Sequence, residues 1–341
     1  MSCKSSVQQI FKDFNKNVFV IAEIGINHEG NIKKCFELID SAHNSGADAI
    51  KIQTINPDEN YSRNNESFSI FSKARLTDDE TIAIFNYCKK KKIRIFTTVG
   101  DFKTLNLISK LSPFAYKISS GLLNNTPLLL EILKKNKPTI ISTGIAINKD
   151  LIKLKKIINK KFKEICIMHC VSLYPTPHNL IGMNYINYLE NYFKCPIGYS
   201  DHTNDYLIPS YAVVSGAVII EKHFTFDINR EGFDHHISFD NVKFKKMVNN
   251  IRRVEKILPV NELLIKKKEI RNKFARFIVA NQDLKKNQII NFKDLGFKRV
   301  KDMKVKGIEP SEVKYFLGKR VNKNIKKDQL IEKKNFYEKK Y

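Results

Sequence analysis

The chain has 341 residues, 42% of them hydrophobic, which is enough for one large domain of about 250 residues and a smaller one. The N-terminus lacks the apolar run of a signal peptide, and no later stretch approaches the roughly 18 apolar residues that span a bilayer. We therefore expect a soluble, cytoplasmic protein with no membrane partner.

The net charge of +25 would suit an anionic partner such as nucleic acid, a membrane surface or a phosphorylated substrate. The lysines, however, are scattered along the whole chain, and no stripe of aromatic and basic residues accompanies them. This distribution favours a solvated, lysine-rich surface, and we expect no nucleic-acid partner.

The six cysteines include no C-x-x-C pair, which favours reduced and mostly buried thiols. Cys166 and Cys170 flank His169, but thiols in a buried strand usually act as small hydrophobic groups. We therefore do not place a metal site there.

Short apolar runs rich in Val and Ile recur between amphipathic stretches and predict eight strands. These runs cover residues 18–23, 48–53, 94–98, 114–119, 138–143, 164–170, 196–200 and 217–223. Runs this apolar are typical of strands that are covered on both faces.

The segments between the strands place apolar residues at helical spacing, for example at 31–45, 77–91, 126–136, 147–159 and 241–257. Strand and helix alternating eight times over about 240 residues predict an α/β fold of the (β/α)8 barrel (TIM barrel) type, over residues 1–260. A doubly wound open sheet usually has fewer strands, and no G-x-G-x-x-G follows the first strand.

The alternation of apolar runs with amphipathic segments ends at about residue 260. Residues 261–273 read as a polar helical linker, and residues 274–341 give short strands, turns and glycines. We predict a second, mainly β domain there.

In a (β/α)8 barrel the loops at the C-terminal ends of the strands surround one cavity. Nearly every predicted strand delivers a polar group to that end. These groups are Glu23, Lys51, Gln53, Thr97, Thr98, Lys117, Ser119, Ser120, Ser142, His169, Ser172, Tyr174, Ser200, Asp201, His202, Glu221 and His223. Any one of them could be a turn residue, but together they predict a functional site.

Two features of this set carry chemical detail. His202 and His223 follow neighbouring strands, so their imidazoles can hold one ion, with Mn²⁺ favoured and Mg²⁺ possible. Lys51 and Lys117, with nearby hydroxyl groups, predict a small, multiply charged anion as ligand.

At these residues the chain resembles the sialic acid synthase family, which includes legionaminic and pseudaminic acid synthases, over essentially its whole length. The matching motifs are IAEIGINHEGN (21–31), KIQT (51–54), KISSG (117–121), ISTG (141–144), MHCVSLYPTP (168–177), IGYSDHT (197–203), EKHF (221–224) and GFDHHISFD (232–240). The tail from 274 is similar to the family's C-terminal antifreeze-like (SAF) domain, which implies a domain-swapped homodimer.

The resemblance implies a role for each matching residue. It places the divalent ion on His202 and His223, which with Glu23 form the catalytic set. Phosphoenolpyruvate (PEP) would contact Lys51, Thr98, Lys117, Ser120, Ser142 and Ser172. The N-acetylated amino sugar would contact Glu23, Gln53, Tyr174, Asp234 and, from the partner's SAF domain, Arg299.

In the implied reaction C3 of PEP attacks the sugar aldehyde, water adds at C2 of PEP, and phosphate leaves by C–O cleavage. Departures from the family pattern lie on the sugar side and nearby: Leu122 replaces an acidic residue, Ser172 replaces the Asn of N-acetylneuraminate-forming relatives, and TTVGD (97–101) lacks the usual proline. The sugar therefore stays open between N-acetylmannosamine, its 6-phosphate and a dideoxy diacetamido hexose. A non-catalytic sugar-binding protein and a heptulosonate-type synthase are the rival interpretations.

Overall fold

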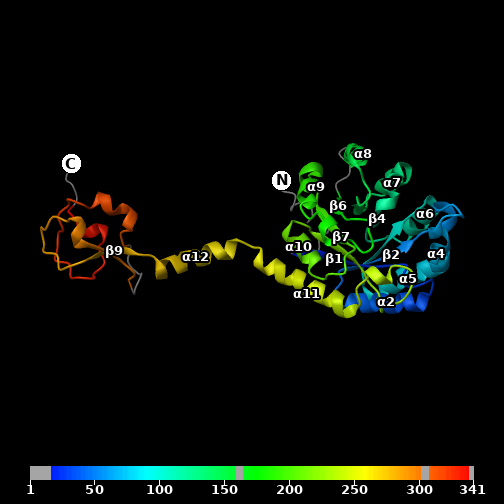
Figure 1. Cartoon of the computed structure of the whole chain (residues 1–341), viewed down its shortest axis with the longest axis horizontal. Coiled ribbons are helices and arrows are strands. Elements are labelled where there is room, and N and C mark those ends of the chain that lie inside the picture. The colour runs from blue at the N-terminus through cyan, green and yellow to red at the C-terminus, as the bar shows by residue number, and fades with distance from the viewer. Residues whose placement is uncertain (1–16, 159–163, 301–306, 338–341) are drawn as a thin grey trace. The chain divides into compact units, whose positions relative to one another are not determined.

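The computed structural model describes residues 17–158, 164–300 and 307–337, and Figure 1 follows the chain through them. Eight parallel strands form a closed barrel in the order β1 to β8, with β1 paired to β8. The strands are β1 (Phe19–Gly25), β2 (Ala49–Thr54), β3 (Ile95–Val99), β4 (Tyr116–Ile118), β5 (Thr139–Ser142), β6 (Ile165–His169), β7 (Ile197–Asp201) and β8 (Ile219–His223). The predicted (β/α)8 fold is confirmed.

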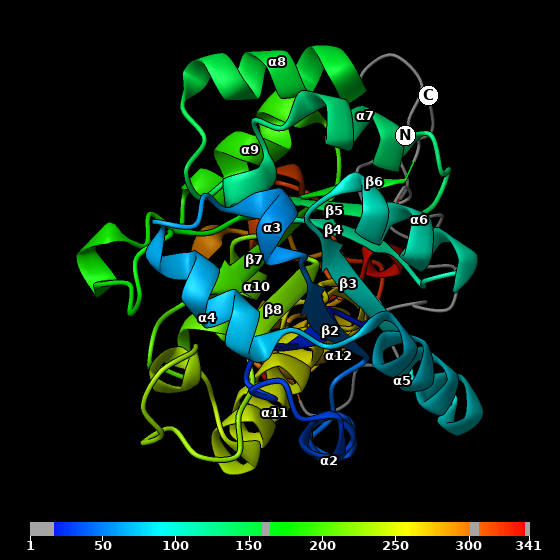
Figure 2. The ribbon, with the colours of Figure 1, turned by 90° about the vertical axis from the view of Figure 1, so that its right-hand side faces the viewer.

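Helices separate the strands and surround the barrel (Figure 2). They are α2 (Ile32–Asn44), α3 (Pro57–Asn60), α4 (Glu66–Ala74), α5 (Asp78–Lys91), α6 (Phe102–Lys110), α7 (Thr126–Leu133), α8 (Asn148–Ile158), α9 (Tyr185–Phe193), α10 (Ile208–Val214) and α11 (Asn241–Ile257). The last residue of the helix predicted at 147–159 lies outside the described residues. β4 begins two residues later than predicted, at Tyr116. It ends at Ile118 because the N–H of Leu122 bonds to the carbonyl of Ser119 and starts a 3₁₀ turn.

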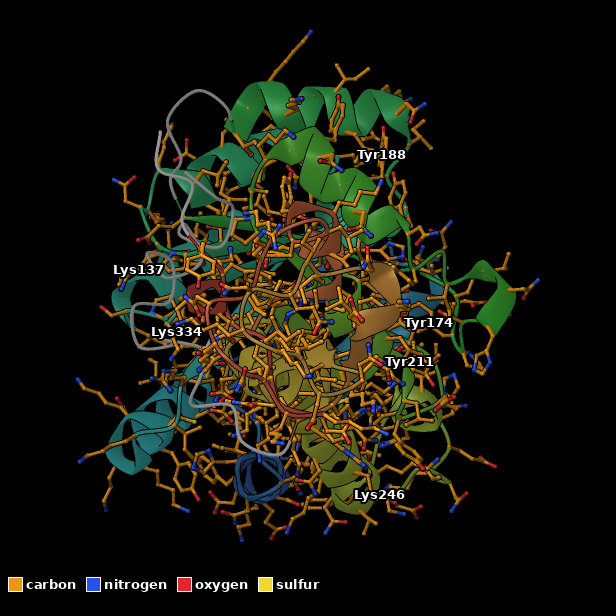
Figure 3. All side chains as sticks on the ribbon, turned by 90° about the vertical axis from the view of Figure 1, so that its left-hand side faces the viewer. Lys137, Tyr174, Tyr188, Tyr211, Lys246 and Lys334 are labelled. Carbon is orange, nitrogen blue, oxygen red and sulfur yellow. The ribbon has the colours of Figure 1, made fainter. Side chains whose placement is uncertain are left out.

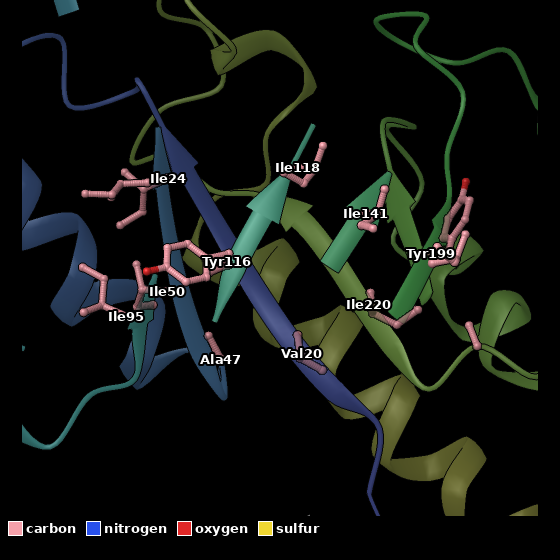
Figure 4. Packing of buried hydrophobic residues seen from close by; sticks show 14 of the residues in the cluster. Val20, Ile24, Ala47, Ile50, Ile95, Tyr116, Ile118, Ile141, Tyr199 and Ile220 are labelled. Carbon is pink, nitrogen blue, oxygen red and sulfur yellow. The ribbon is translucent and has the colours of Figure 1, made fainter. Parts of the chain in front are cut away.

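The strands bury both faces, and each face has its own core. Outward-pointing residues such as Val20, Ile50 and Ile220 pack against the helices, as Figure 4 shows for part of this layer. Inward-pointing residues fill the N-terminal half of the barrel with a second apolar cluster, which includes Phe96 and Met168. Each fully buried aliphatic side chain contributes about 1.5 to 3 kcal/mol to folding, so the barrel is a packed core and not a pore.

The chain divides into two compact units between Leu258 and Pro259. The second unit begins with α12 (Asn261–Phe274), where the sequence predicts a helical linker. Strands β9 (Phe277–Ala280) and β10 (Leu295–Lys298) then form an antiparallel pair. Further bridges such as Val279 to Leu330 and a separate hydrophobic cluster complete this unit. No helix among the described residues of either unit is long and apolar enough to cross a membrane.

One ion pair lies between the barrel and its helix layer. Lys222 and Asp201 point outward from β8 and β7, both side chains are fully buried, and their charged atoms lie 2.9 Å apart. The ammonium also lies 4.1 Å from the centre of the Phe239 ring, and the Tyr199 hydroxyl donates to the carboxylate. Each charge in this layer thus depends on the other for compensation.

Replacing Asp201 by alanine would leave the Lys222 ammonium buried without a carboxylate. We expect the free energy of unfolding to fall by about 3 to 5 kcal/mol, measured by urea denaturation and far-UV circular dichroism. The double variant Asp201→Ala/Lys222→Met removes both charges and should recover most of that loss. A double variant as unstable as the single one would show that the ion pair is not the cause.

Candidate active site

The register of the strands brings ionisable side chains into one layer inside the barrel. Glu23 of β1 pairs with Lys51 of β2 on one side and with His223 of β8 on the other. Because side chains alternate along a strand, Glu221 and His223 point inward above Ile219 of the apolar cluster. The interior is therefore apolar at its N-terminal end and charged at its C-terminal end.

Two lysines and two glutamates form the centre of this layer, and all four are buried. Lys51 Nζ lies 2.5 Å from Glu23 Oε2 and 3.6 Å from Glu221 Oε2, while Lys117 Nζ lies 3.4 Å from Glu221 Oε1. Lys51 also lies 3.4 Å from the hydroxyl of Thr98. The carboxylate of Glu221 thus lies between both ammonium groups.

The pKa values in this cluster follow from burial and from these neighbours. Burial raises the pKa of Glu23, and Lys51 only partly opposes that effect. Burial also acts on Glu221, but the positive charges of Lys117 and Lys51 outweigh it and lower the pKa of that carboxyl. Burial lowers the pKa of Lys117, whereas for Lys51 the two carboxylates outweigh burial and raise the pKa.

The two histidines lie at the rim of the same layer, with ring centres 5.7 Å apart. His202 Nδ1 lies 2.8 Å from the carbonyl oxygen of Val171, so Nδ1 carries the proton and Nε2 keeps a free lone pair. Burial lowers the pKa of His202 to about 4 and that of His223 well below its usual value. Both imidazoles are therefore neutral near pH 7, the form that binds metal ions.

The donor set fits a two-imidazole ion site. His223 Nδ1 is buried and has no hydrogen-bond partner among the described residues. Three or more His, Cys, Asp or Glu side chains do not converge on a metal position anywhere in the described part of the chain. An ion held by His202 and His223 would thus keep open positions for substrate or water.

Hydroxyl groups line the neighbouring wall, at the ends of β4, β5 and β6. Ser120 Oγ accepts a hydrogen bond of 2.9 Å from the N–H of Gly144 and lies 3.3 Å from Cys170 Sγ. The buried hydroxyl of Ser142 has no partner among the described residues. A Cβ on Gly144 would lie 2.5 Å from Ser172 Oγ, so only glycine leaves this cradle open.

The predicted sugar-side residues lie on the other side of Glu23. Gln53 Nε2 donates to Glu23 Oε1 at 2.8 Å, and Asp234 Oδ2 lies 3.6 Å from His223 Nδ1. The Tyr174 ring lies 4.5 Å from the His202 ring, measured between their centres. Burial raises the pKa of Asp234 to about 6. Leu122, in contrast, is half-buried and packs against the outer core.

Comparison with known proteins places this barrel in a family. The model of the NeuB family matches residues 38–262, which is most of the barrel, and the model of the SAF domain matches residues 275–336. The chain belongs to the NeuB family. The predicted membership is confirmed, as is the C-terminal SAF domain.

NeuB-family relatives match along nearly their whole length. The pseudaminic acid synthase of Campylobacter jejuni strain 81-176 is 32% identical, over 94% of this chain and 97% of its own. The N,N'-diacetyllegionaminic acid synthase of Campylobacter jejuni NCTC 11168 is also 32% identical, over 93% and 99% of the two chains. The crystal structure of N-acetylneuraminic acid synthetase from Leptospira borgpetersenii superposes with a TM-score of 0.71 at 33% identity, covering 76% of this chain and 93% of that one.

Within this NeuB-family barrel, the structure brings together all the predicted site residues of the first unit. Arg299 belongs to the second unit, where its guanidinium lies 5.3 Å from the centre of the Phe274 ring. Three of the strand-end residues named in the sequence analysis do not face the site. Asp201 points outward to Lys222, and His169 Nε2 bonds to the carbonyl of Ile181 at 2.6 Å. Thr97 points outward from β3, between the inward-pointing Phe96 and Thr98, and its hydroxyl donates to the carbonyl of Ile52 at 3.0 Å.

Sequence reasoning placed Glu221 and Cys170 at strand ends but assigned no role to either. Glu221 contacts both lysines and accepts a hydrogen bond from Ser200, and Cys170 contacts Ser120. The signal for Glu221 was available, because it lies two residues before His223 and so on the same face of β8. The neighbours of Cys170 come from other strands, so only the fold places them together.

The raised pKa of Asp234 predicts a pH-dependent stability. Between about pH 4 and pH 6 the folded protein holds a proton that the unfolded chain releases, so ionising Asp234 costs stability as the pH rises through that window. We expect Asp234→Asn, measured with chelator present, to gain stability relative to the parent as the pH rises from about 4 to about 7. A stability difference that is the same at both pH values would contradict this assignment.

Proposed function

We propose that this chain is a nonulosonate synthase that condenses PEP and water with an N-acetylated amino sugar to give a nine-carbon 2-keto acid and phosphate. The observation that carries the proposal is the buried layer of Lys51, Lys117, Glu23 and Glu221 beside two neutral histidines. The relatives named as pseudaminic and legionaminic acid synthases support the same reaction class.

The charges of this layer favour an anionic substrate together with a divalent cation. The two ammonium groups of this layer are balanced by its two carboxylates. PEP would bring about two negative charges on its phosphate and one on its carboxylate. Burying that charge needs further positive charge, and an ion on His202 and His223 would supply it.

We place a divalent ion on His202 and His223, with Mn²⁺ preferred and Mg²⁺ possible. When bound, the ion would polarise the aldehyde of the open-chain sugar. Lys51, Lys117 and Thr98 would bind the acidic groups of PEP, and the hydroxyls of Ser120, Ser142 and Ser172 would complete its cradle. Both substrates would then be held next to each other in a site shielded from bulk water.

Glu23 would act on the sugar, either by handling a proton or by positioning a hydroxyl group. Burial raises the pKa of its carboxyl, which favours a role in proton transfer, and Gln53 fixes the orientation of that carboxyl. Tyr174 and Asp234 would bind the same substrate from beside His202 and His223.

The sugar is N-acetylmannosamine, its 6-phosphate or a dideoxy diacetamido hexose. The half-buried side chain of Leu122 offers no acceptor for a hydroxyl group, which favours a substrate with a deoxy or methyl carbon. The alternative is that Leu122 only packs on the core and does not contact the sugar. We favour the 6-phosphate least, because the described residues on the sugar side include no extra basic cluster.

Phosphate release from PEP, with Mn²⁺ and a panel of these three sugars, tests the reaction. We expect sugar-dependent turnover that chelator abolishes, and a loss of at least about a hundredfold in kcat/KM in His202→Ala or His223→Ala. The matched control is His178→Ala, which changes an exposed histidine. Sugar binding without any turnover would contradict a synthase and favour a sugar-binding protein.

We further propose that the SAF domain acts on the barrel of a second copy, through Arg299. If so, an inactive Arg299→Ala chain mixed with an inactive His223→Ala chain should regain activity, since each mixed dimer holds one intact site. Random exchange predicts recovery of about a quarter of the parent activity. Verified subunit exchange without recovery would contradict action across the dimer, and His223→Ala alone is the baseline.

A further inference from the structure

Three polar side chains on the proposed sugar side converge around Gly25, the last residue of β1. A Cβ on this glycine would lie 3.0 Å from Glu23 Oε1, 3.3 Å from Gln53 Nε2 and 3.6 Å from Asp234 Oδ2. Gly25 has a φ of +57°, in the left-handed region that favours glycine. Glu23 and Gln53 lie on strands, so the barrel itself fixes their backbones. Asp234 comes from the connection after β8 and needs another means of support.

The position of the Asp234 carboxylate depends on how the backbone of this residue is held. The carboxylate lies 3.6 Å from His223 Nδ1 but accepts no hydrogen bond from any residue in the described part of the chain. The backbone, in contrast, is bonded to side chains at both of its polar groups. The N–H of Asp234 donates to Asn27 Oδ1 at 3.1 Å, and its carbonyl accepts from Ser238 Oγ at 2.6 Å.

Asn27 ties this backbone to the barrel. It lies in the turn after β1 and is buried. Besides accepting from Asp234, it donates through Nδ2 to the carbonyl of Phe224 at 3.0 Å and to Ser238 Oγ at 2.9 Å. An amide supplies one acceptor and two donors, whereas a carboxylate of the same size would supply acceptors alone. All the hydrogen-bonding groups of the Asn27 side chain are therefore used, and each of their partners lies after β8.

A second set of contacts joins the same two segments. His235 Nε2 lies 3.1 Å from Glu29 Oε1, and Arg230 donates to Glu29 Oε2 at 2.9 Å. These contacts hold the connection after β8 as a whole. Asn27 acts at Asp234 itself, because its hydrogen bond ends on the backbone N–H of that residue.

We infer that Asn27 is a positioning residue for the sugar, which holds the backbone of Asp234 so that the carboxylate stays beside Glu23 and Gln53. The inference rests on the proposed function and adds a residue that acts on the substrate through another side chain. Asn27 is buried and fully bonded, so it has no group left to bind the sugar directly. Its hydrogen bonds go to the connection after β8 and not to the lysines proposed to bind PEP.

Replacing Asn27 by alanine removes the support of Asp234. In the phosphate-release assay we expect KM for the best sugar of the panel to rise about tenfold, because the carboxylate is no longer held in place. KM for PEP should change less than about twofold. Ser238→Ala removes the bond to the Asp234 carbonyl but keeps the bond from the Asp234 N–H to Asn27. It should therefore raise KM for the sugar by only about threefold, again without an effect on PEP.

A double-mutant cycle tests whether Asn27 acts through Asp234. Asp234→Ala should by itself raise KM for the sugar at least about tenfold. Adding Asn27→Ala should change that KM less than about twofold, because the carboxylate that Asn27 positions is gone, whereas independent effects would multiply to about a hundredfold. The matched control is Asn249→Ala, an exposed asparagine on α11, the helix that carries Lys246 in Figure 3. It should leave every parameter unchanged.

The outcomes distinguish the two levels of the proposal. A parent enzyme that turns over none of the sugars overturns the synthase function and this inference with it. If the parent turns over a sugar, three results overturn the role of Asn27 alone: an unchanged KM for the sugar in Asn27→Ala, an equal rise in KM for sugar and PEP, or effects that multiply with those of Asp234→Ala. If Asn27→Ala does not fold, Ser238→Ala decides, and an unchanged KM for the sugar in that variant overturns the inference.

Discussion

Two lysine side chains are buried inside the barrel, and the carboxylate of Glu221 lies between them. Without that carboxylate and Glu23, two ammonium groups would be buried close together with no compensation, which is strongly unfavourable. The rest of the site is arranged around this balance. Ser200 orients Glu221, Gln53 orients Glu23, and the histidines stay neutral above the cluster.

The apolar half of the barrel makes this charged layer possible. Inward residues near the N-terminal ends of the strands form an apolar cluster beneath the ionic layer. Electrostatic interactions are stronger beside such an apolar cluster than in water, because the local dielectric constant is lower. The outer ion pair of Lys222 and Asp201 shows the same rule in the helix layer, where two opposite charges are buried together.

The loops at the C-terminal end of the barrel position their side chains in a different way from the strands. Strand register holds Glu23, Lys51 and Glu221 at neighbouring positions, whereas Asp234 reaches the site from the long connection after β8. That connection is held by side-chain bonds, such as the one from the N–H of Asp234 to Asn27 Oδ1.

The sequence by itself determined the barrel, the SAF domain and the family, because strand periodicity and strand-end motifs are local patterns that survive without coordinates. It also named most of the residues that meet at the mouth. It did not determine that Glu221 lies between the two lysines. Nor did it determine that His169 and Asp201 point away from the site. Each of these depends on which side chains from distant strands and loops face one another, and only the tertiary structure decides that.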